Sequence, residues 1–131
     1  MFINTAGRKA HLKLGRFGED TAVKLLKIKG YRILARNFRL KSGELDIVAL
    51  DGLTIVFVEV KTLRRLPGFT PGGNLSTKQM KHNYATGKYY LALFGIKEIR
   101  HRYDLIEITV SRQEPRKLLN VVHTLDLFHT A

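Results

Sequence analysis

The sequence lacks cysteine entirely. This absence excludes disulfide bridges and metal sites built from thiolates, and it is typical of proteins that work in a reducing compartment. The chain also lacks any apolar run near the roughly 18 residues that a membrane-spanning helix needs. Its N-terminal sequence, MFINTAGRKAHLKLGR, is polar and basic, unlike a secretion signal. We therefore expect a cytoplasmic protein with no membrane association.

Acidic residues are scarce. Asp and Glu together number 11 against 23 Lys and Arg, which gives a formal net charge of +12. A charge of this size on a small protein attracts polyanions, so nucleic acid is the first partner to consider. Anionic membrane surfaces, acidic protein partners and a purely solubilising role are the alternatives that charge alone leaves open.

The length of 131 residues is that of one domain with one hydrophobic core. The chain contains no internal repeat, no low-complexity tract and no segment with the composition of a linker. We therefore expect a single domain over residues 1–131, in which the basic residues 1–13 form a flexible N-terminal segment.

Hydrophobic periodicity predicts an α/β protein with the element order αβββαββ. A helix is expected over about residues 6–29, ended by Gly30, and an Asp-Gly turn at 51–52 is expected between the second and third strands. The stretch LPGFTPGGNLS at 66–76 has loop composition and is expected to be mobile. The expected strands cover 31–38, 42–50, 53–62, 99–110 and 118–128, and a second helix covers 76–94.

Two charges interrupt the apolar strand VFVEVKTLRR at 56–65. Because side chains alternate along a strand, Glu59 and Lys61 share the face of Phe57. Asp46 lies on the preceding strand of the hairpin, within reach of Glu59 if the register brings them together. Glu19 has helical spacing to the apolar residues that follow it, so we expect it to face the sheet.

Carboxylates gathered at a half-buried point repel one another and lose hydration, so they need protons, cationic partners or a metal ion. A set of Asp46, Glu59 and Glu19 offers only oxygen ligands, which suit Mg²⁺ or Mn²⁺ better than zinc. Lys61 would stand beside the metal-bound water. The alternatives are a same-face ion pair of Glu59 with Lys61, an ordinary helix carboxylate at Glu19 and an acid near a turn at Asp46.

Further basic residues are candidates for contacts with the phosphates of a nucleic acid, with an ordinary solvated charged face as the alternative. They are Arg64 and Arg65 after the charged strand, Lys78, Lys81 and Lys88 on the second helix, and Arg36, Arg39 and Lys41 near the second strand. The five histidines show no metal-ligand spacing and are assigned no role.

The segments GRFGEDTAVKLLKIKGYRILARNFR, GELDIVALDG, IVFVEVKTLRR and RYDLIEI, in this order and with the helix that holds Lys78, resemble the YraN-like family of small bacterial proteins. Those proteins resemble the archaeal Holliday junction resolvases and, more widely, the PD-(D/E)xK restriction-endonuclease-like nucleases. The resemblance covers nearly the whole chain from about Gly15. The sequence has Leu45-Asp46 where the signature that gives the superfamily its name has Pro-Asp.

This resemblance implies a restriction-endonuclease-like core, a mixed sheet of about five strands flanked by helices. It implies that Asp46, Glu59 and the backbone carbonyl of Val60 coordinate the metal, and that Lys61 is the superfamily lysine. Glu19 matches the helix glutamate of resolvase-like members and is a further possible metal ligand. Asp104 matches the aspartate of the family's RYD segment, which we interpret as structural or as a support for the site residues, and resolvase-like relatives imply a homodimer.

The sequence therefore predicts a metal-dependent endonuclease that hydrolyses phosphodiester bonds, with DNA, branched or otherwise structured, favoured over RNA. Two alternatives stay open. The first is a nucleic-acid-binding module that keeps the nuclease fold without cutting. The second is an interaction protein in which the acidic residues form only a buried ion-pair cluster around Lys61.

Overall fold

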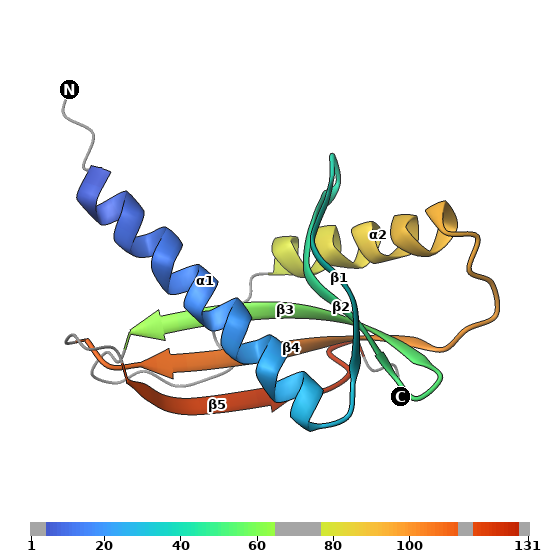
Figure 1. The fold of residues 1–131 in the computed structure, drawn as a ribbon. Helices are drawn as coiled ribbons and strands as arrows, with labels where there is room; N and C mark the ends of the chain where they lie inside the picture. The colour runs from blue at the N-terminus through green and yellow to red at the C-terminus, as the bar shows by residue number, and fades with distance from the viewer. Residues whose placement is uncertain (1–4, 65–76, 113–116, 129–131) are drawn as a thin grey trace.

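The computed structural model describes residues 5–64, 77–112 and 117–128, which form two helices and five strands (Figure 1). The predicted α/β class and the element order αβββαββ are confirmed. Arg65, the predicted loop at 66–76 and the first four residues lie outside the described part. The elements are α1 (Thr5–Ile28), β1 (Arg32–Leu40), β2 (Gly43–Asp51), β3 (Thr54–Arg64), α2 (Thr77–Leu93), β4 (His101–Val110) and β5 (Leu118–Thr124).

The five strands form one mixed sheet in the order β1-β2-β3-β4-β5, as the resemblance implied. Neighbouring strands run antiparallel except β3 and β4, which are parallel. Parallel neighbours need a crossover connection, and helix α2 lies in the segment that makes it. The expected Asp-Gly turn is also present, since Asp51 pairs with Thr54 across the tight connection between β2 and β3.

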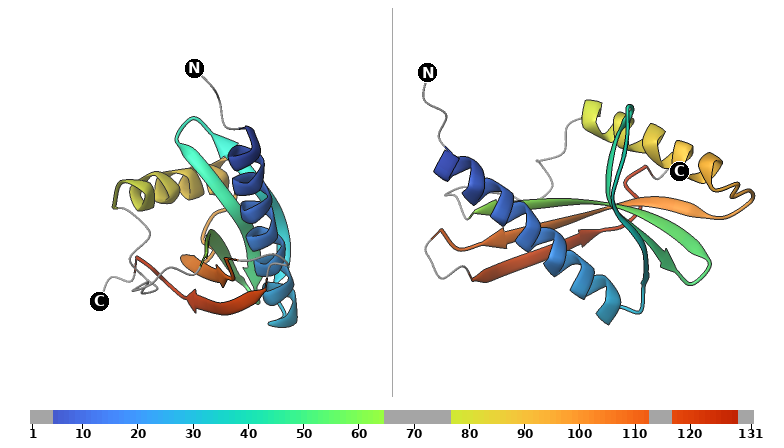
Figure 2. Two further views of the ribbon diagram at one scale, coloured as in Figure 1. Left: turned by 90° about the vertical axis from the view of Figure 1, so that its left-hand side faces the viewer. Right: turned by 45° about the horizontal axis from the view of Figure 1, so that its top comes forward.

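The two helices cover opposite faces of the sheet, and β3 supplies the core of both (Figure 2). Val56 and Val58 belong to the cluster that packs with α1, whereas Ile55 and Phe57 belong to the cluster that includes Tyr90 of α2. A strand buried on both faces reads as a continuous apolar run, which explains the composition of residues 55–58. The charged residues Glu59 and Lys61 follow directly after that run.

Both helices end at a glycine with positive φ. Gly30 has φ 91°, its N–H donates to the carbonyl of Lys27, and the next N–H, that of Tyr31, donates to the carbonyl of Leu26. This bonding pattern closes a helix with a left-handed residue, a conformation that glycine adopts without steric cost. Gly95 ends α2 in the same way, with φ 63°.

Each helix also carries a glycine at a point of close approach to the sheet. A Cβ placed on Gly18 of α1 would lie 1.6 Å from the hydroxyl oxygen of Thr62, and one placed on Gly87 of α2 would lie 2.2 Å from that of Tyr103. Gly87, which interrupts the helical pattern of the sequence, is thus required by packing. At these two glycines, helix α1 packs closely against β3 and helix α2 packs closely against β4.

The β1–β2 hairpin curls away from the rest of the sheet (Figure 1). Pairing between β2 and β3 starts at Asp51↔Thr54 and ends at Ile47↔Val58, while pairing between β1 and β2 continues to Leu40↔Gly43. Asn37 in β1 has φ 53°, an uncommon conformation for a residue other than glycine. The two strands that carry Asp46 and Glu59 therefore separate where these residues lie.

Helix α1 begins at Thr5, close to the expected start at about residue 6, so it takes in residues 5–13 of the segment that was expected to be flexible. Strand β5 ends at Thr124 instead of 128, because the N–H of Asp126 donates to the side chain of Asp104 and that of Leu127 to the carbonyl of Tyr103. Within the described residues, no helix combines the length and the apolar character needed to cross a membrane.

Candidate active site at the parting of two strands

Asp46 lies at the point where β2 leaves β3. The main-chain N–H of Val60 donates to Oδ2 of Asp46 at 2.8 Å, beyond the last paired residues of these strands. The Asp46 side chain thus bonds to β3 where the regular ladder has ended. This fixes the carboxylate beside the strand that carries Glu59 and Lys61.

Glu59 is held by side chains from two elements. Its Oε1 lies 3.2 Å from Nζ of Lys61 and accepts a hydrogen bond from the Gln79 amide at 2.8 Å. Its Oε2 accepts a bond from the Asn83 amide at 2.9 Å. Gln79 and Asn83 stand four residues apart on α2, so they lie on one face of that helix, toward the sheet. The Glu59 side chain is only 11% exposed, so these partners replace much of the hydration of its carboxylate.

The side chains of Asp46 and Glu59 line the same small hollow, and their charges interact. Burial and the neighbouring charge of Glu59 raise the pKa of Asp46 to about 7, against the opposing effect of the Val60 N–H. Burial also raises the pKa of Glu59, although the ammonium of Lys61 acts in the other direction. Two carboxyl groups in this arrangement share a proton or require a cation, which is the environment that the sequence predicted.

Glu19 approaches the same place from α1. Burial, followed by the charge of Asp46, raises the pKa of Glu19. Two groups of β1 lower the pKa of Glu19. The amide of Asn37, placed in the orientation that satisfies its hydrogen bonds, has its nitrogen 3.2 and 3.3 Å from the two Glu19 carboxylate oxygens. Nη2 of Arg36 lies 3.9 Å from Oε2 of Glu19. Glu19 therefore faces the strands, as its helical spacing predicted.

Two hollows meet at Asp46 and Glu44, which line both of them. An open hollow of about 770 Å³ lies between α1 and the β1–β2 hairpin. A smaller hollow of about 230 Å³ lies on the α2 side and includes Glu59 and His82. The larger hollow is lined by Gly15, Arg16, Glu19, Asp20, Arg36, Asn37, Arg39, Glu44 and Asp46.

The donor set fits a hard divalent cation in part. Asp46 and Glu59 supply the one or two carboxylates with which proteins usually hold Mg²⁺, and both line the smaller hollow. Within residues 5–64, 77–112 and 117–128, no group of three or more His, Cys, Asp or Glu residues stands close enough to hold a metal ion. Glu19 is accordingly outside the immediate donor set, and water or substrate oxygens would supply the remaining ligands.

The candidate phosphate-binding residues fall into separate groups. Arg36 and Arg39 line the larger hollow, where Nε of Arg39 lies 3.3 Å from Glu44. Arg64 is exposed at the end of β3, and Arg65 lies outside the described residues. The lysines Lys41, Lys78, Lys81 and Lys88 are exposed, and the ammonium of Lys88 lies 4.6 Å from the ring centre of Tyr84.

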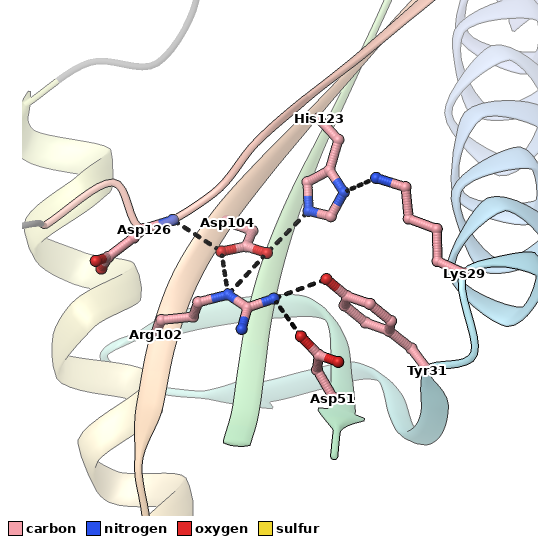
Figure 3. A network of polar contacts seen from close by, with 7 residues as sticks. All are labelled: Lys29, Tyr31, Asp51, Arg102, Asp104, His123 and Asp126. Carbon is pink, nitrogen blue, oxygen red and sulfur yellow. Dashed lines mark hydrogen bonds and ion pairs between the residues drawn. The ribbon is translucent and has the colours of Figure 1, made fainter. Parts of the chain in front are cut away.

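Asp104 belongs to a different polar network, at the C-terminal end of α1 (Figure 3). Its buried carboxylate accepts bonds from Arg102, from the N–H of Asp126 and from His123 at 2.8 Å. The other ring nitrogen of His123 lies 2.7 Å from Nζ of Lys29. Burial alone would raise the pKa of Asp104, but these hydrogen bonds outweigh burial and lower it. The contacts agree with the structural interpretation of Asp104 and give His123 a partner that its sequence spacing did not reveal.

Sequence reasoning missed four residues of the site. Gln79 and Asn83 hold Glu59, and Arg16 and Glu44 line the larger hollow. The spacing of Gln79 and Asn83 on one helix face was the available signal, but polar residues at that spacing are common on solvated helices. Nothing in the sequence marked Arg16 among the many basic residues of α1.

A five-stranded mixed sheet with one helix on each face, and acidic residues where two strands part, is consistent with a restriction-endonuclease-like core. The model of the family described as "Uncharacterised protein family UPF0102" matches residues 18–108, and the chain belongs to this family. The YraN-like resemblance of the sequence is thereby confirmed.

Relatives from several bacteria share the family name. A UPF0102 protein of Caldicellulosiruptor saccharolyticus is 43% identical over 96 residues, which cover 73% of this chain and 81% of the relative. A UPF0102 protein of Prosthecochloris aestuarii is 37% identical over 117 residues, covering 88% and 92%. One of Geobacter sulfurreducens is 36% identical over 115 residues, covering 87% and 89%. The similarity thus extends over most of both chains, although the family name states no reaction.

Proposed function

We propose that this protein is a divalent-metal-dependent endonuclease that hydrolyses phosphodiester bonds in DNA, branched or otherwise structured. The observation that carries the proposal is that Asp46 and Glu59, on two separating strands, line one hollow, with Nζ of Lys61 3.2 Å from Glu59. Such a carboxylate pair is poorly stable without a proton or a cation. Three arginines line the neighbouring hollow, and an arginine guanidinium can donate two parallel hydrogen bonds to phosphate oxygens.

The site residues have distinct tasks in this proposal. Asp46 and Glu59 would hold Mg²⁺ or Mn²⁺, with the Val60 carbonyl as a further candidate ligand. The bound ion would lower the pKa of a water molecule and offset charge on the phosphate. Lys61 orients the attacking water through its ammonium and stabilises charge on the phosphoryl oxygens. Gln79 and Asn83 keep the Glu59 carboxylate oriented, and Glu19 supplies additional negative charge near Asp46.

A binding surface for nucleic acid is available on the side of the larger hollow. Arg16, Arg36 and Arg39 line it, and the net charge of +12 supplies sequence-independent attraction to a phosphate backbone. We assign these arginines to the scissile strand. Arg64 and the α2 lysines Lys78 and Lys81 would contact flanking phosphates, because they are exposed on the elements that carry Glu59 and its partners.

A second candidate function is a nucleic-acid-binding module that does not cut. The observation that favours it is that both Glu59 oxygens already accept hydrogen bonds from α2, and Oε1 also pairs with Lys61. A carboxylate satisfied in this way can serve as part of a structural network. The same contacts are what an interaction protein with a buried ion-pair cluster would show.

Calorimetric titration with Mn²⁺ tests the proposal and separates the three functions. Wild type, Asp46→Asn and Glu59→Gln are compared with Glu98→Gln, which makes the same charge change as Glu59→Gln on an exposed residue after α2. The endonuclease proposal predicts Mn²⁺ binding in wild type and Glu98→Gln and its loss in both site variants. DNA binding, measured by fluorescence anisotropy in EDTA, is expected to persist in all four proteins because the basic surface is intact.

Other outcomes favour the competing functions. Salt-sensitive DNA binding with no Mn²⁺ binding in wild type would support the binding module. Absence of both, together with a large loss of stability in Glu59→Gln, would support the ion-pair cluster, because removal of one partner leaves Lys61 without compensation.

A further inference from the structure

Arg36 is paired with the acidic side of the candidate site. Its Nη2 lies 2.7 Å from Oδ1 of Asp20 and 3.9 Å from Oε2 of Glu19. Its side chain is 37% exposed, so the guanidinium borders the open hollow and is not sealed in the core. The charge of Arg36 is therefore near Glu19, and the pKa of Glu19 is in turn raised by burial and by the charge of Asp46.

The acidic and basic charges that line this hollow nearly cancel. Its charged residues are four acids, Glu19, Asp20, Glu44 and Asp46, and three arginines, Arg16, Arg36 and Arg39. Two of the arginines form ion pairs within the hollow, Arg36 with Asp20 and Arg39 with Glu44. Two of the three arginines expected to meet phosphate are thus occupied with carboxylates of the same hollow.

A cation that enters beside Asp46 competes with Arg36 for the same negative potential. Arg36 weakens that potential, so its presence reduces the affinity for a divalent ion. Conversely, a bound divalent ion weakens the attraction of Glu19 for Arg36, which leaves only the exposed ion pair with Asp20 to compete with another anion for the guanidinium. By thermodynamic linkage, an anion that binds Arg36 strengthens metal binding by the same factor.

We propose that Arg36 is the internal counter-ion of the metal-free site, and that divalent-metal binding loosens it from Glu19, so that a phosphate of the nucleic acid can replace the exposed Asp20 as its partner. Metal and nucleic acid then bind cooperatively through this one residue. This inference rests on the proposed function, because it requires a metal at Asp46 and Glu59. It adds an order to the binding events, in which the metal prepares the phosphate contact.

The test compares Arg36→Gln with Arg36→Lys and with the control Arg32→Gln. Arg32 is an exposed arginine on the same strand, outside the lining of the hollow. Mn²⁺ affinity is measured by calorimetry without DNA. Affinity for a labelled DNA duplex is measured by fluorescence anisotropy with Mn²⁺ and with EDTA, and a denaturing gel verifies that the DNA is intact. Circular dichroism confirms that each variant is folded.

The inference predicts that Arg36→Gln binds Mn²⁺ about three- to tenfold more tightly than wild type, since one partly screened charge is removed near the ion. Arg36→Lys and Arg32→Gln should stay close to wild type in this measurement. In wild type, Mn²⁺ should strengthen DNA binding, and this gain should shrink in Arg36→Gln but not in Arg32→Gln.

Three results would overturn the inference. Equal loss of DNA affinity in Arg36→Gln with and without Mn²⁺ would make Arg36 an ordinary phosphate contact. Weaker Mn²⁺ binding in a folded Arg36→Gln would mean that Arg36 supports the site. If wild type binds no Mn²⁺, the proposed function fails and the inference fails with it, whereas either of the first two results leaves the proposed function intact.

Discussion

The N–H of Val60 donates to Oδ2 of Asp46 at 2.8 Å, so a side chain of β2 bonds to the backbone of β3 where strand pairing has ended. This bond holds Asp46 near Glu59 while the β1–β2 hairpin turns away. The bond therefore has a structural role that is separate from any charge on Asp46, and substitutions can separate the two.

Asp46→Asn and Asp46→Ala should differ in stability but not in metal binding. Asparagine keeps an oxygen that can accept the Val60 N–H, and it removes a charge that burial and Glu59 disfavour. Alanine leaves the N–H without this acceptor, so we expect it to be about 1 kcal/mol less stable than asparagine. Urea unfolding in EDTA measures the difference. Equal stability of the two variants would argue against the structural role of the bond, and retained Mn²⁺ binding in either would remove Asp46 from the ligand set.

Lys61→Met should separate catalysis from binding. Lys61 is not a metal ligand in this account, and Gln79 and Asn83 still hold Glu59 when the ammonium is removed. We expect DNA cleavage in Mg²⁺ to fall by about 100-fold or more. DNA affinity in EDTA, measured by anisotropy, should change little, and Mn²⁺ affinity, measured by calorimetry, should not fall, because a positive charge 3.2 Å from Glu59 is removed. Cleavage that persists at the wild-type rate would exclude Lys61 from the reaction.

Two glycines of α1, three residues apart, should respond in opposite directions to alanine. A Cβ on Gly18 would meet Thr62 at 1.6 Å, whereas one on Gly15 has no atom within 4 Å. Gly18→Ala should therefore destabilise the protein by about 1–3 kcal/mol, as overpacking does. Gly15→Ala should stabilise it by up to about 1 kcal/mol, because alanine favours the helix.

Thermal unfolding of both variants checks this pair. Because Glu19 follows Gly18 directly, a displaced α1 should also weaken Mn²⁺ binding in Gly18→Ala and leave it unchanged in Gly15→Ala. Equal stabilities for the two variants would mean that α1 does not approach β3 at Thr62 as closely as the structure has it.

Asp104 should make part of the free energy of unfolding depend on pH in the acidic range. Its folded-state pKa is lowered, because hydrogen bonds from His123, Asp126 and Arg102 outweigh the effect of burial. The unfolded chain therefore takes up this proton first as pH falls. The stabilising contribution is present above the unfolded value of about 4 and is lost as pH falls through the lower folded value.

We expect Asp104→Asn to lose about 2–4 kcal/mol at pH 7, because a buried charged network loses a partner. The difference from wild type should narrow as pH falls below about 4. Asp20→Asn is the control, since its ion pair with Arg36 is exposed and worth less than about 1 kcal/mol. Urea unfolding at several pH values measures both variants. A difference that stays constant with pH would show that Asp104 does not act through its charge.

The fold followed from the sequence because its periodic signals were strong. Residues 55–58 are uniformly apolar and are buried on both faces, and Gly30 and Gly95 end helices in the expected conformation. The placement of Asp46 and Glu59 beside one hollow agrees with alternation along two strands and one tight turn. These are local patterns, or contacts across a short hairpin, in which sequence distance is small.

The remaining features depend on contacts between distant segments. Glu59 is bound by Gln79 and Asn83, 20 and 24 residues away, and Asp104 by His123, 19 residues away. The β1–β2 hairpin curls away from the sheet and borders the larger hollow. The sequence shows this curl only at Asn37, which by its hydrophobic pattern is an ordinary strand residue. Such features need the packed structure, because no local period encodes which polar side chains will meet.

The most direct test of the central claim is cleavage of a labelled four-way DNA junction, with matched linear duplex and single strand, in Mg²⁺, Mn²⁺ and EDTA. Wild type is compared with Glu59→Ala. The account predicts cleavage in either metal, none in EDTA and none by the variant. Binding of the junction by both proteins without cleavage in any metal would contradict the account and favour the binding module.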